Sequence, residues 1–262
     1  MHLLTSLNPL YSLSGLLVGL LVGLTGVGGG SLMTPLLVLV FGVHPTTAVG
    51  TDLLYAAATK TVGTGVHGFK RTVQWRIVGL LAAGSAPATI ITLWALSQQA
   101  KHAAAVNGLI TTALGWALIT TAIAILFRRA IVGFVVARTR ELEPGRAAGL
   151  TILLGAVLGV LVSLTSVGAG ALGMTVLLML YPKMDVAKLV GSDIAHAVPL
   201  TLLAGLGHWM MGSVDWRLLV SLLSGSIPGI VVGSLLAARM PDGVLRPVLA
   251  GTLALVGAKM LT

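Results

Sequence analysis

Ten long apolar runs constrain this chain more than any other feature of its sequence. They cover residues 9–26, 31–43, 47–67, 75–97, 103–127, 147–166, 170–181, 187–210, 216–238 and 244–261. A helix needs about 20 apolar residues to cross a bilayer, and most of these runs reach or approach that length. Charged residues make up only 9% of the chain, against about 25% in soluble domains. We therefore predict an all-α polytopic integral membrane protein and exclude a soluble enzyme.

Two of the runs, 31–43 and 170–181, are too short to cross the membrane comfortably. Each follows a glycine-rich break, Thr25–Ser31 in the first case and Thr165–Ala171 in the second. Glycine costs about 1 kcal/mol relative to alanine inside a helix, so such clusters interrupt helices. We expect broken or re-entrant helices at both places.

The sequence repeats itself at an offset of 140, which becomes 141 after a one-residue slip. V-G-T-D at residues 49–52 matches V-G-S-D at residues 190–193, and 12 of the 42 positions from 49 to 90 are identical without a gap. We predict two transmembrane repeats of about five hydrophobic segments each, joined by a basic linker. The first repeat covers residues 1–127, the linker 128–146 and the second repeat 147–262.

The odd number of segments in each half predicts that the two repeats have inverted topology. If the linker is cytoplasmic, twelve Lys and Arg residues lie inside and three lie outside, which is the bias that orients membrane proteins. Both termini are then expected on the outer side of the cell inner membrane. These basic clusters account for the net charge of +9, and no basic face with interleaved aromatic residues indicates a nucleic-acid partner.

The two glycine-rich breaks are the best candidates for a binding site. Open backbone at membrane depth persists only where it is buried in protein or lines a cavity. The helix N-terminus after each break presents free N–H groups and a partial positive charge, which together favour an anion. The candidate substrate-binding residues are Thr25, Gly26, Gly28, Gly29, Gly30, Ser31, Thr165, Ser166, Gly168 and Gly170. The alternative is that these glycines only let helices pack closely.

Three ionisable residues stand inside or beside the apolar runs. Asp52 and Asp193 are repeat equivalents, and we predict that they either couple a proton to transport or cap the helices that contain them. Lys60 has Thr201 as its equivalent. Such a lysine must pair, reach the interface or face a cavity, and attraction of an anion is one hypothesis for it.

Two histidines and two prolines also repeat. His67 matches His208, and both histidines are candidate gate or anion-attracting groups, with packing as the alternative. Pro87 matches Pro228, and we expect both prolines to kink their helices, because proline removes an intrahelical hydrogen bond.

T-G-V-G-G-G at residues 25–30, followed by V-G-T-D and, in the second half, by V-G-S-D, resembles the sulfite exporter TauE/SafE family. This family is also called the toluene sulfonate uptake permease group. The resemblance covers roughly residues 10–262. It implies a prokaryotic inner-membrane transporter for small sulfur-containing anions such as sulfite, sulfonates and sulfoacetate.

The sequence thus predicts a secondary active transporter that moves a small anion by alternating access, a mechanism typical of inverted repeats. The expected partners are the anion, protons and the lipid bilayer, and a homo-oligomer is compatible with the pattern. The chain has no cysteine and no H-E-x-x-H motif, so we expect no metal, no cofactor and no enzymatic activity. The alternatives are an anion channel, a membrane scaffold and an intramembrane enzyme.

Overall fold

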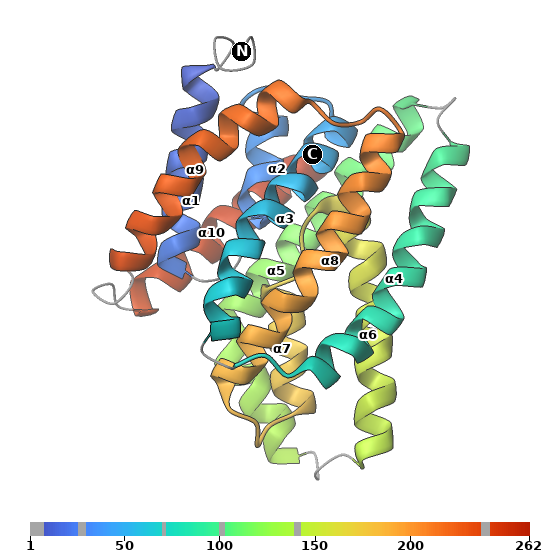
Figure 1. Ribbon diagram of the computed structural model, residues 1–262, viewed down its shortest axis with the longest axis vertical. Coiled ribbons are helices and arrows are strands. Elements are labelled where there is room, and N and C mark those ends of the chain that lie inside the picture. Colours follow the sequence, from blue (N-terminus) through green and yellow to red (C-terminus); the bar gives the residue numbers. More distant parts are fainter. Residues whose placement is uncertain (1–7, 26–29, 70–71, 100–102, 139–142, 237–241) are drawn as a thin grey trace.

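The computed structural model describes residues 8–25, 30–69, 72–99, 103–138, 143–236 and 242–262, which form ten α-helices and no strand (Figure 1). The helices are α1 (Pro9–Thr25), α2 (Gly30–Leu39), α3 (Pro45–Phe69), α4 (Trp75–Gln98), α5 (Ala103–Arg138), α6 (Pro144–Thr165), α7 (Ala171–Leu180), α8 (Val186–Met210), α9 (Trp216–Leu236) and α10 (Asp242–Leu261). The predicted all-α class is confirmed.

Within the described part of the chain, five helices are long and apolar enough to cross a membrane. They are α4, α5, α6, α8 and α9. The helices α2 and α7 have only 10 residues each, which corresponds to about 15 Å, or half of a bilayer core. Helix α3 has 25 residues, as many as α8, and it carries Asp52 and Lys60.

Helix α5 is longer than the apolar run that predicts it. It continues from Ala103 to Arg138 without interruption, so the first part of the predicted linker, 128–138, is helical. The segment after Phe127 is still rich in Ala, Ile, Val and Phe and contains no proline, so nothing in it ends the helix. The next helix begins at Pro144, a residue whose fixed φ suits the first helical turn.

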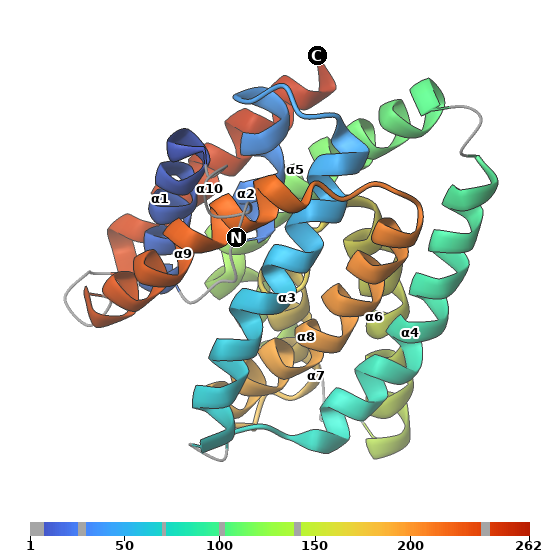
Figure 2. The ribbon, with the colours of Figure 1, turned by 45° about the horizontal axis from the view of Figure 1, so that its top comes forward.

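Helices of the first half pack mainly against helices of the second half. The pairs in extensive contact are α1 with α9, α4 with α6, α3 with α8 and α5 with α10 (Figures 1 and 2). At the repeat offset α1 corresponds to α6 and α4 to α9, so the first two pairs are equivalent to each other.

The equivalent pairs are held by equivalent glycines. A Cβ on Gly15 of α1 would collide with the backbone carbonyl of Leu222 on α9. A Cβ on Gly155 of α6 would collide in the same way with the carbonyl of Leu81 on α4. These four residues are repeat equivalents, and the absent side chains let the helix backbones touch, as is common in membranes.

Hydrogen bonds at the starts of α4 and α9 also join the two halves. The Asp215 amide donates to Thr51 Oγ1 at 3.0 Å, and the Gln74 amide donates to Ser192 Oγ at 2.8 Å. The first bond ties the start of α9 to α3, and the second ties the start of α4 to α8. Thr51 and Ser192 directly precede the two repeat-equivalent aspartates.

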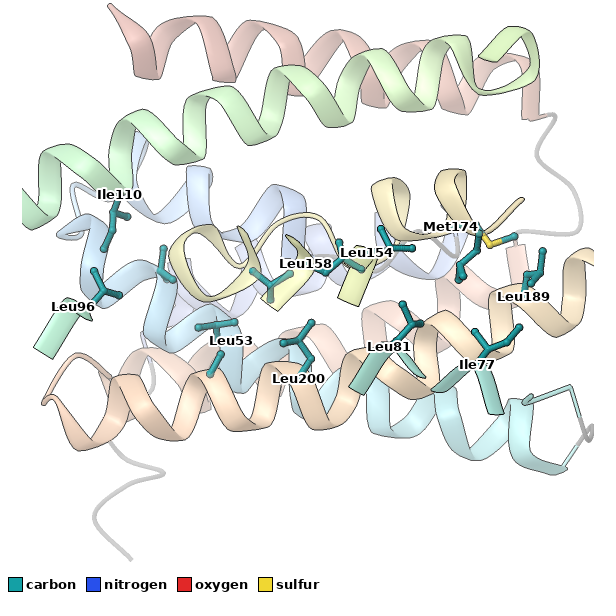
Figure 3. Packing of buried hydrophobic residues seen from close by; sticks show 14 of the residues in the cluster. Leu53, Ile77, Leu81, Leu96, Ile110, Leu154, Leu158, Met174, Leu189 and Leu200 are labelled. Carbon is teal, nitrogen blue, oxygen red and sulfur yellow. The ribbon is translucent and has the colours of Figure 1, made fainter. Parts of the chain in front are cut away.

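The largest apolar cluster joins the two halves around the central helices. Figure 3 shows its side chains gathered from α3, α4, α5, α6, α7 and α8. Among the residues labelled there are Leu53, Leu81, Ile110, Leu158, Met174 and Leu200. Ala169 of the second glycine-rich break packs against this cluster.

Candidate functional site

The second glycine-rich break interrupts the chain between α6 and α7, as the sequence predicts. Helix α6 ends at Thr165 and α7 starts at Ala171. Between them Ser166, Gly168 and Gly170 have φ values of 59°, 118° and 122°. Side-chain-bearing residues rarely adopt positive φ, so the two glycines are required here by the path of the backbone.

The two hydroxyls of this break have different roles. Thr165 Oγ1 donates to the Leu161 carbonyl at 2.7 Å and accepts from the Val167 amide at 3.1 Å. The hydrogen bonds of the Thr165 hydroxyl are therefore made with the backbone at the end of α6. Ser166 is buried, and its Oγ has no hydrogen-bond partner. Of the predicted hydroxyl donors that the structure describes, Ser166 is the one available to a ligand.

The start of α7 faces the same break. The amides of Gly173 and Met174 donate to the carbonyls of Gly168 and Gly170 at 3.2 and 3.1 Å. The first amides of a helix have no acceptor one turn earlier, and they carry the positive end of the helix dipole. The break therefore contains both the unpaired Ser166 hydroxyl and the N-terminus of α7.

Lys60 brings a positive charge to this break from α3. Its Nζ donates to the Ala169 carbonyl at 3.3 Å, although the residue is only 8% exposed. A buried ammonium group needs compensating partners, because taking an ion out of water is costly. The structure therefore pairs a cation with the non-helical backbone that the glycines create.

Asp52 lies on the same helix as Lys60, two turns earlier. It is fully buried and accepts a hydrogen bond from Thr34 Oγ1 of α2 at 2.5 Å. Its second oxygen, Oδ1, has no partner. Ser166 approaches this carboxylate from the other half without meeting hydrogen-bond geometry, and the charge of Lys60 acts on it.

Asp193 occupies the equivalent position on α8 and has different surroundings. Its Oδ1 also has no hydrogen-bond partner and lies only 2.6 Å from the position that a Cβ on Gly173 of α7 would take. The charge of Lys60 acts on Asp193 as it does on Asp52. One lysine thus serves two buried carboxylates, one from each half.

The capping role predicted as an alternative for these aspartates is wrong. Helix α3 starts at Pro45 and α8 at Val186, so both carboxylates lie two turns inside their helices. The N-cap of α8 is Asp185, whose side chain accepts from the Ala187 amide at 2.8 Å.

The remaining predicted residues lie away from this break or outside the described residues. His208 is buried, and its Nε2 donates to the Ser163 carbonyl at 2.9 Å, a contact between α8 and α6. His67 belongs to α3, but its side chain is outside the described residues. Pro87 and Pro228 lie inside α4 and α9, and the kinks expected there stay a prediction.

The first glycine-rich break is only partly described. Residues 26–29, which include Gly26, Gly28 and Gly29, fall outside the described residues, as do the side chains of Thr25 and Ser31. Gly30 opens α2. The binding role of this break therefore stays a prediction.

Two buried polar pairs that join the halves were not predicted from the sequence. His196 Nε2 lies 2.9 Å from Ser85 Oγ, and Tyr55 Oη lies 2.5 Å from Ser226 Oγ. At an offset of 141, His196 corresponds to Tyr55 and Ser85 to Ser226. The repeat alignment contained the signal, because both serines are among its identities and the other two positions are polar in an apolar run.

No group of three or more His, Cys, Asp or Glu side chains in the described part of the chain is arranged to hold a metal ion. The charged groups at the break are two carboxylates and one lysine. This combination suits the binding of a small anion or the transfer of a proton.

A helical bundle of apolar spans, with a broken helix and buried charges at its centre, defines the class of polytopic membrane transport proteins. Comparison with known families gives the particular family. The model of the family described as Sulfite exporter TauE/SafE matches residues 11–260. The chain belongs to this family of membrane transporters, and it is not an enzyme.

Curated relatives carry the same kind of description. The chain is 39% identical to the probable membrane transporter protein YjnA of Bacillus subtilis, over 95% of this chain and 98% of the relative. It is 28% identical to the probable membrane transporter protein YdhB of the same organism, over 94% and 96%. A probable membrane transporter protein of Xylella fastidiosa is 27% identical, over 86% and 83%. No solved structure gives a significant match.

Proposed function

We propose that this protein is a secondary active transporter that moves a small oxyanion, such as sulfite or a sulfonate, across the inner membrane. The observation that carries the proposal is the contact of Lys60 Nζ with the Ala169 carbonyl in the α6–α7 break. A buried ammonium group that donates to a neutral carbonyl can exchange this acceptor for an anion. The helix N-terminus in the same break offers the anion further donors. The family description, which names sulfite, supports this class of substrate.

The bound anion takes the place of the Ala169 carbonyl as the partner of Lys60. An ammonium–oxyanion contact is stronger than one between the same ammonium and a neutral carbonyl. The unpaired Ser166 hydroxyl and the first amides of α7 supply further donors. The surrounding apolar cluster keeps water away, and a low dielectric constant strengthens each of these contacts.

Alternating access follows from two halves that rock about this site. The equivalent contacts of α1 with α9 and of α6 with α4 support a two-fold relation between the halves. The end of α5 and the start of α6 lie in the lower part of Figure 1, while the start of α1 and the end of α10 lie in its upper part. This arrangement favours a cytoplasmic linker and outward-facing termini, as the charge bias predicts.

The two carboxylates make protons the natural coupling ion. With Lys60 charged and both aspartates ionised, the cluster carries one net negative charge, and an anion adds a second in a medium of low dielectric constant. Protonation of one group removes that cost. Uptake of the anion together with a proton is therefore the coupling that the site favours.

Uptake into proteoliposomes tests the proposed function. The panel comprises sulfite, methanesulfonate, sulfate and acetate, each with and without an inward proton gradient. We expect saturable uptake of at least one sulfur oxyanion, counter-exchange with the unlabelled anion, and stimulation by the gradient. Flux that does not saturate would indicate a channel, chemical conversion of the anion an enzyme, and absence of flux for all four anions a scaffold.

A further inference from the structure

We propose that His196 is a further anion-binding residue of this site and that it takes up the proton that enters with the anion. This inference rests on the proposed function and deepens it, because it assigns the proton to one side chain. It also distinguishes the two halves, because the second half has a histidine at this position and the first half has a tyrosine.

The position of His196 puts it in the charged cluster. It follows Asp193 by three residues on α8, and residues with this spacing lie on the same face of a helix. It is 0% exposed, and the charge of Lys60 acts on its ring. The same lysine contacts the backbone of the α6–α7 break, so one cation links the break to the face of α8 that carries Asp193 and His196.

The ring of His196 is bonded on one side and open on the other. Nε2 lies 2.9 Å from Ser85 Oγ of α4, whereas Nδ1 is buried and has no hydrogen-bond partner. A neutral imidazole has one donor and one acceptor, and a protonated imidazole has two donors. When Nε2–H donates to Ser85, protonation at Nδ1 creates a second N–H donor. An oxyanion can accept a hydrogen bond from this second donor.

The charges around His196 link its proton to the anion. Besides Asp193 on α8, the ionisable groups facing the cluster are Lys60, Asp52 and Tyr55 on α3, and the charge of Arg128 on α5 also reaches Asp193. The described parts of α6 and α7 that line the break carry no ionisable side chain. In the empty site a proton on His196 adds a second cation beside Lys60. With both aspartates ionised, that proton brings the cluster from one net negative charge to zero, so a bound anion enters a neutral cluster and not a negative one.

The equivalent residue in the first half performs the bonding role without the proton. Tyr55 bonds Ser226 as His196 bonds Ser85, but a phenol keeps its proton at neutral pH, whereas an imidazole exchanges one there. The position in the first half therefore holds the helices together, and the position in the second half does so and also accepts a proton.

Isothermal titration of the purified full-length protein tests this assignment. The probe is methanesulfonate, which stays fully ionised at neutral pH, so any proton that moves belongs to the protein. Titrations between about pH 5 and 8 cover the range in which histidine changes charge. Two buffers with different enthalpies of ionisation give the number of protons taken up. Sulfite and sulfate are titrated in parallel.

We expect the wild-type protein to take up about one proton per anion, with an affinity that rises up to about tenfold for each unit by which the pH falls. In His196→Gln the amide keeps the bond to Ser85, and the pH dependence should flatten. Tyr55→Phe is the matched control, and it should keep the wild-type slope. The proton number measured on the unaltered protein tests proton uptake itself, and the comparison of His196→Gln with Tyr55→Phe tests its assignment to His196.

Each other outcome contradicts a different statement. Binding without proton uptake overturns the inference and leaves the proposed anion site standing. A wild-type slope in His196→Gln moves the proton to a carboxylate and overturns the assignment to the histidine. Failure of methanesulfonate, sulfite and sulfate to bind overturns both the inference and the proposed function.

Discussion

The two halves of this protein share their packing contacts and differ in their polar centres. Gly15 and Gly155 sit against equivalent carbonyls, and Tyr55 and His196 bond equivalent serines. Only one half, however, contributes a lysine, because Thr201 occupies the position equivalent to Lys60, and its hydroxyl donates to the Ala197 carbonyl of its own helix. The symmetric residues hold helices together, and the unsymmetric ones create the charged site.

The carboxylates show the same division. Asp52 accepts a hydrogen bond from Thr34 of α2. The residue equivalent to Thr34 is Thr175 of α7, but its hydroxyl donates to the Ala171 carbonyl at 2.7 Å instead. Asp193 lies against Gly173 without such a donor at Oδ1. A duplicated scaffold can thus hold one carboxylate firmly and leave the other free to respond to a ligand.

Breaking the symmetric contacts should have the largest effect. Gly15→Leu and Gly155→Leu each force a side chain into a neighbouring backbone, and overpacking of this kind costs about 1–3 kcal/mol or more. We expect both variants to lose most monodisperse protein in size-exclusion chromatography. Gly149→Leu, on the same helix as Gly155 but with open space around its Cβ, is the control and should behave as wild type. An intact Gly155→Leu protein would contradict the close packing of α6 with α4.

Removing the unsymmetric cation should weaken anion binding more than the equivalent substitution in the other half. Lys60→Gln loses a charged hydrogen bond to the anion, worth about 1.5–3 kcal/mol, which corresponds to about 10- to 100-fold in affinity. Titration with methanesulfonate measures the change. Thr201→Val, the equivalent substitution in the other half, should change the affinity less than about twofold, because Thr201 bonds only its own helix. Equal losses in both variants would mean that the site is symmetric.

Neutralising the two carboxylates should separate their roles. Asp52→Asn weakens a charge-assisted bond from Thr34, so we expect a loss of stability of about 1 kcal/mol or more. Asp193→Asn loses no such bond at Oδ1, and its stability should change less. Thermal unfolding in detergent compares the two, and a larger loss in Asp193→Asn would contradict the difference between the halves.

The smallest effect is expected at the hydroxyl of the break. Ser166→Ala removes one neutral donor, worth about 0.5–1.5 kcal/mol, so the affinity for methanesulfonate should fall no more than about tenfold. Thr175→Val, which removes a hydroxyl bonded within α7, serves as the control. An unchanged affinity in Ser166→Ala would exclude Ser166 from the site.

Much of the fold was predictable, because a bilayer imposes simple requirements on sequence. Runs of about 20 apolar residues must form helices in lipid, and the helix boundaries lie close to the ends of those runs. The break at Ser166–Gly170 was predictable from glycine content alone. The extension of α5 to Arg138 was not, because the basic residues after Phe127 interrupt the apolar run without interrupting the helix.

The site was harder to predict than the fold. Its candidate residues were recognisable as polar groups in apolar runs, but their partners depend on which helices cross. Only the approach of α3 to the α6–α7 break brings Lys60 to the Ala169 carbonyl, and the two residues lie 109 positions apart. His196 was overlooked because its equivalent is a tyrosine, and a search for identical pairs passes over a position where the halves differ.

The central claim is that an oxyanion binds at the α6–α7 break beside Lys60. Anomalous diffraction from crystals soaked in selenite, the selenium counterpart of sulfite, tests it directly, because native protein contains no other selenium. The account predicts one selenium peak with its oxygens within hydrogen-bond distance of Lys60 Nζ and Ser166 Oγ. A peak outside the helical bundle, with Lys60 still bonded to the Ala169 carbonyl, would contradict it.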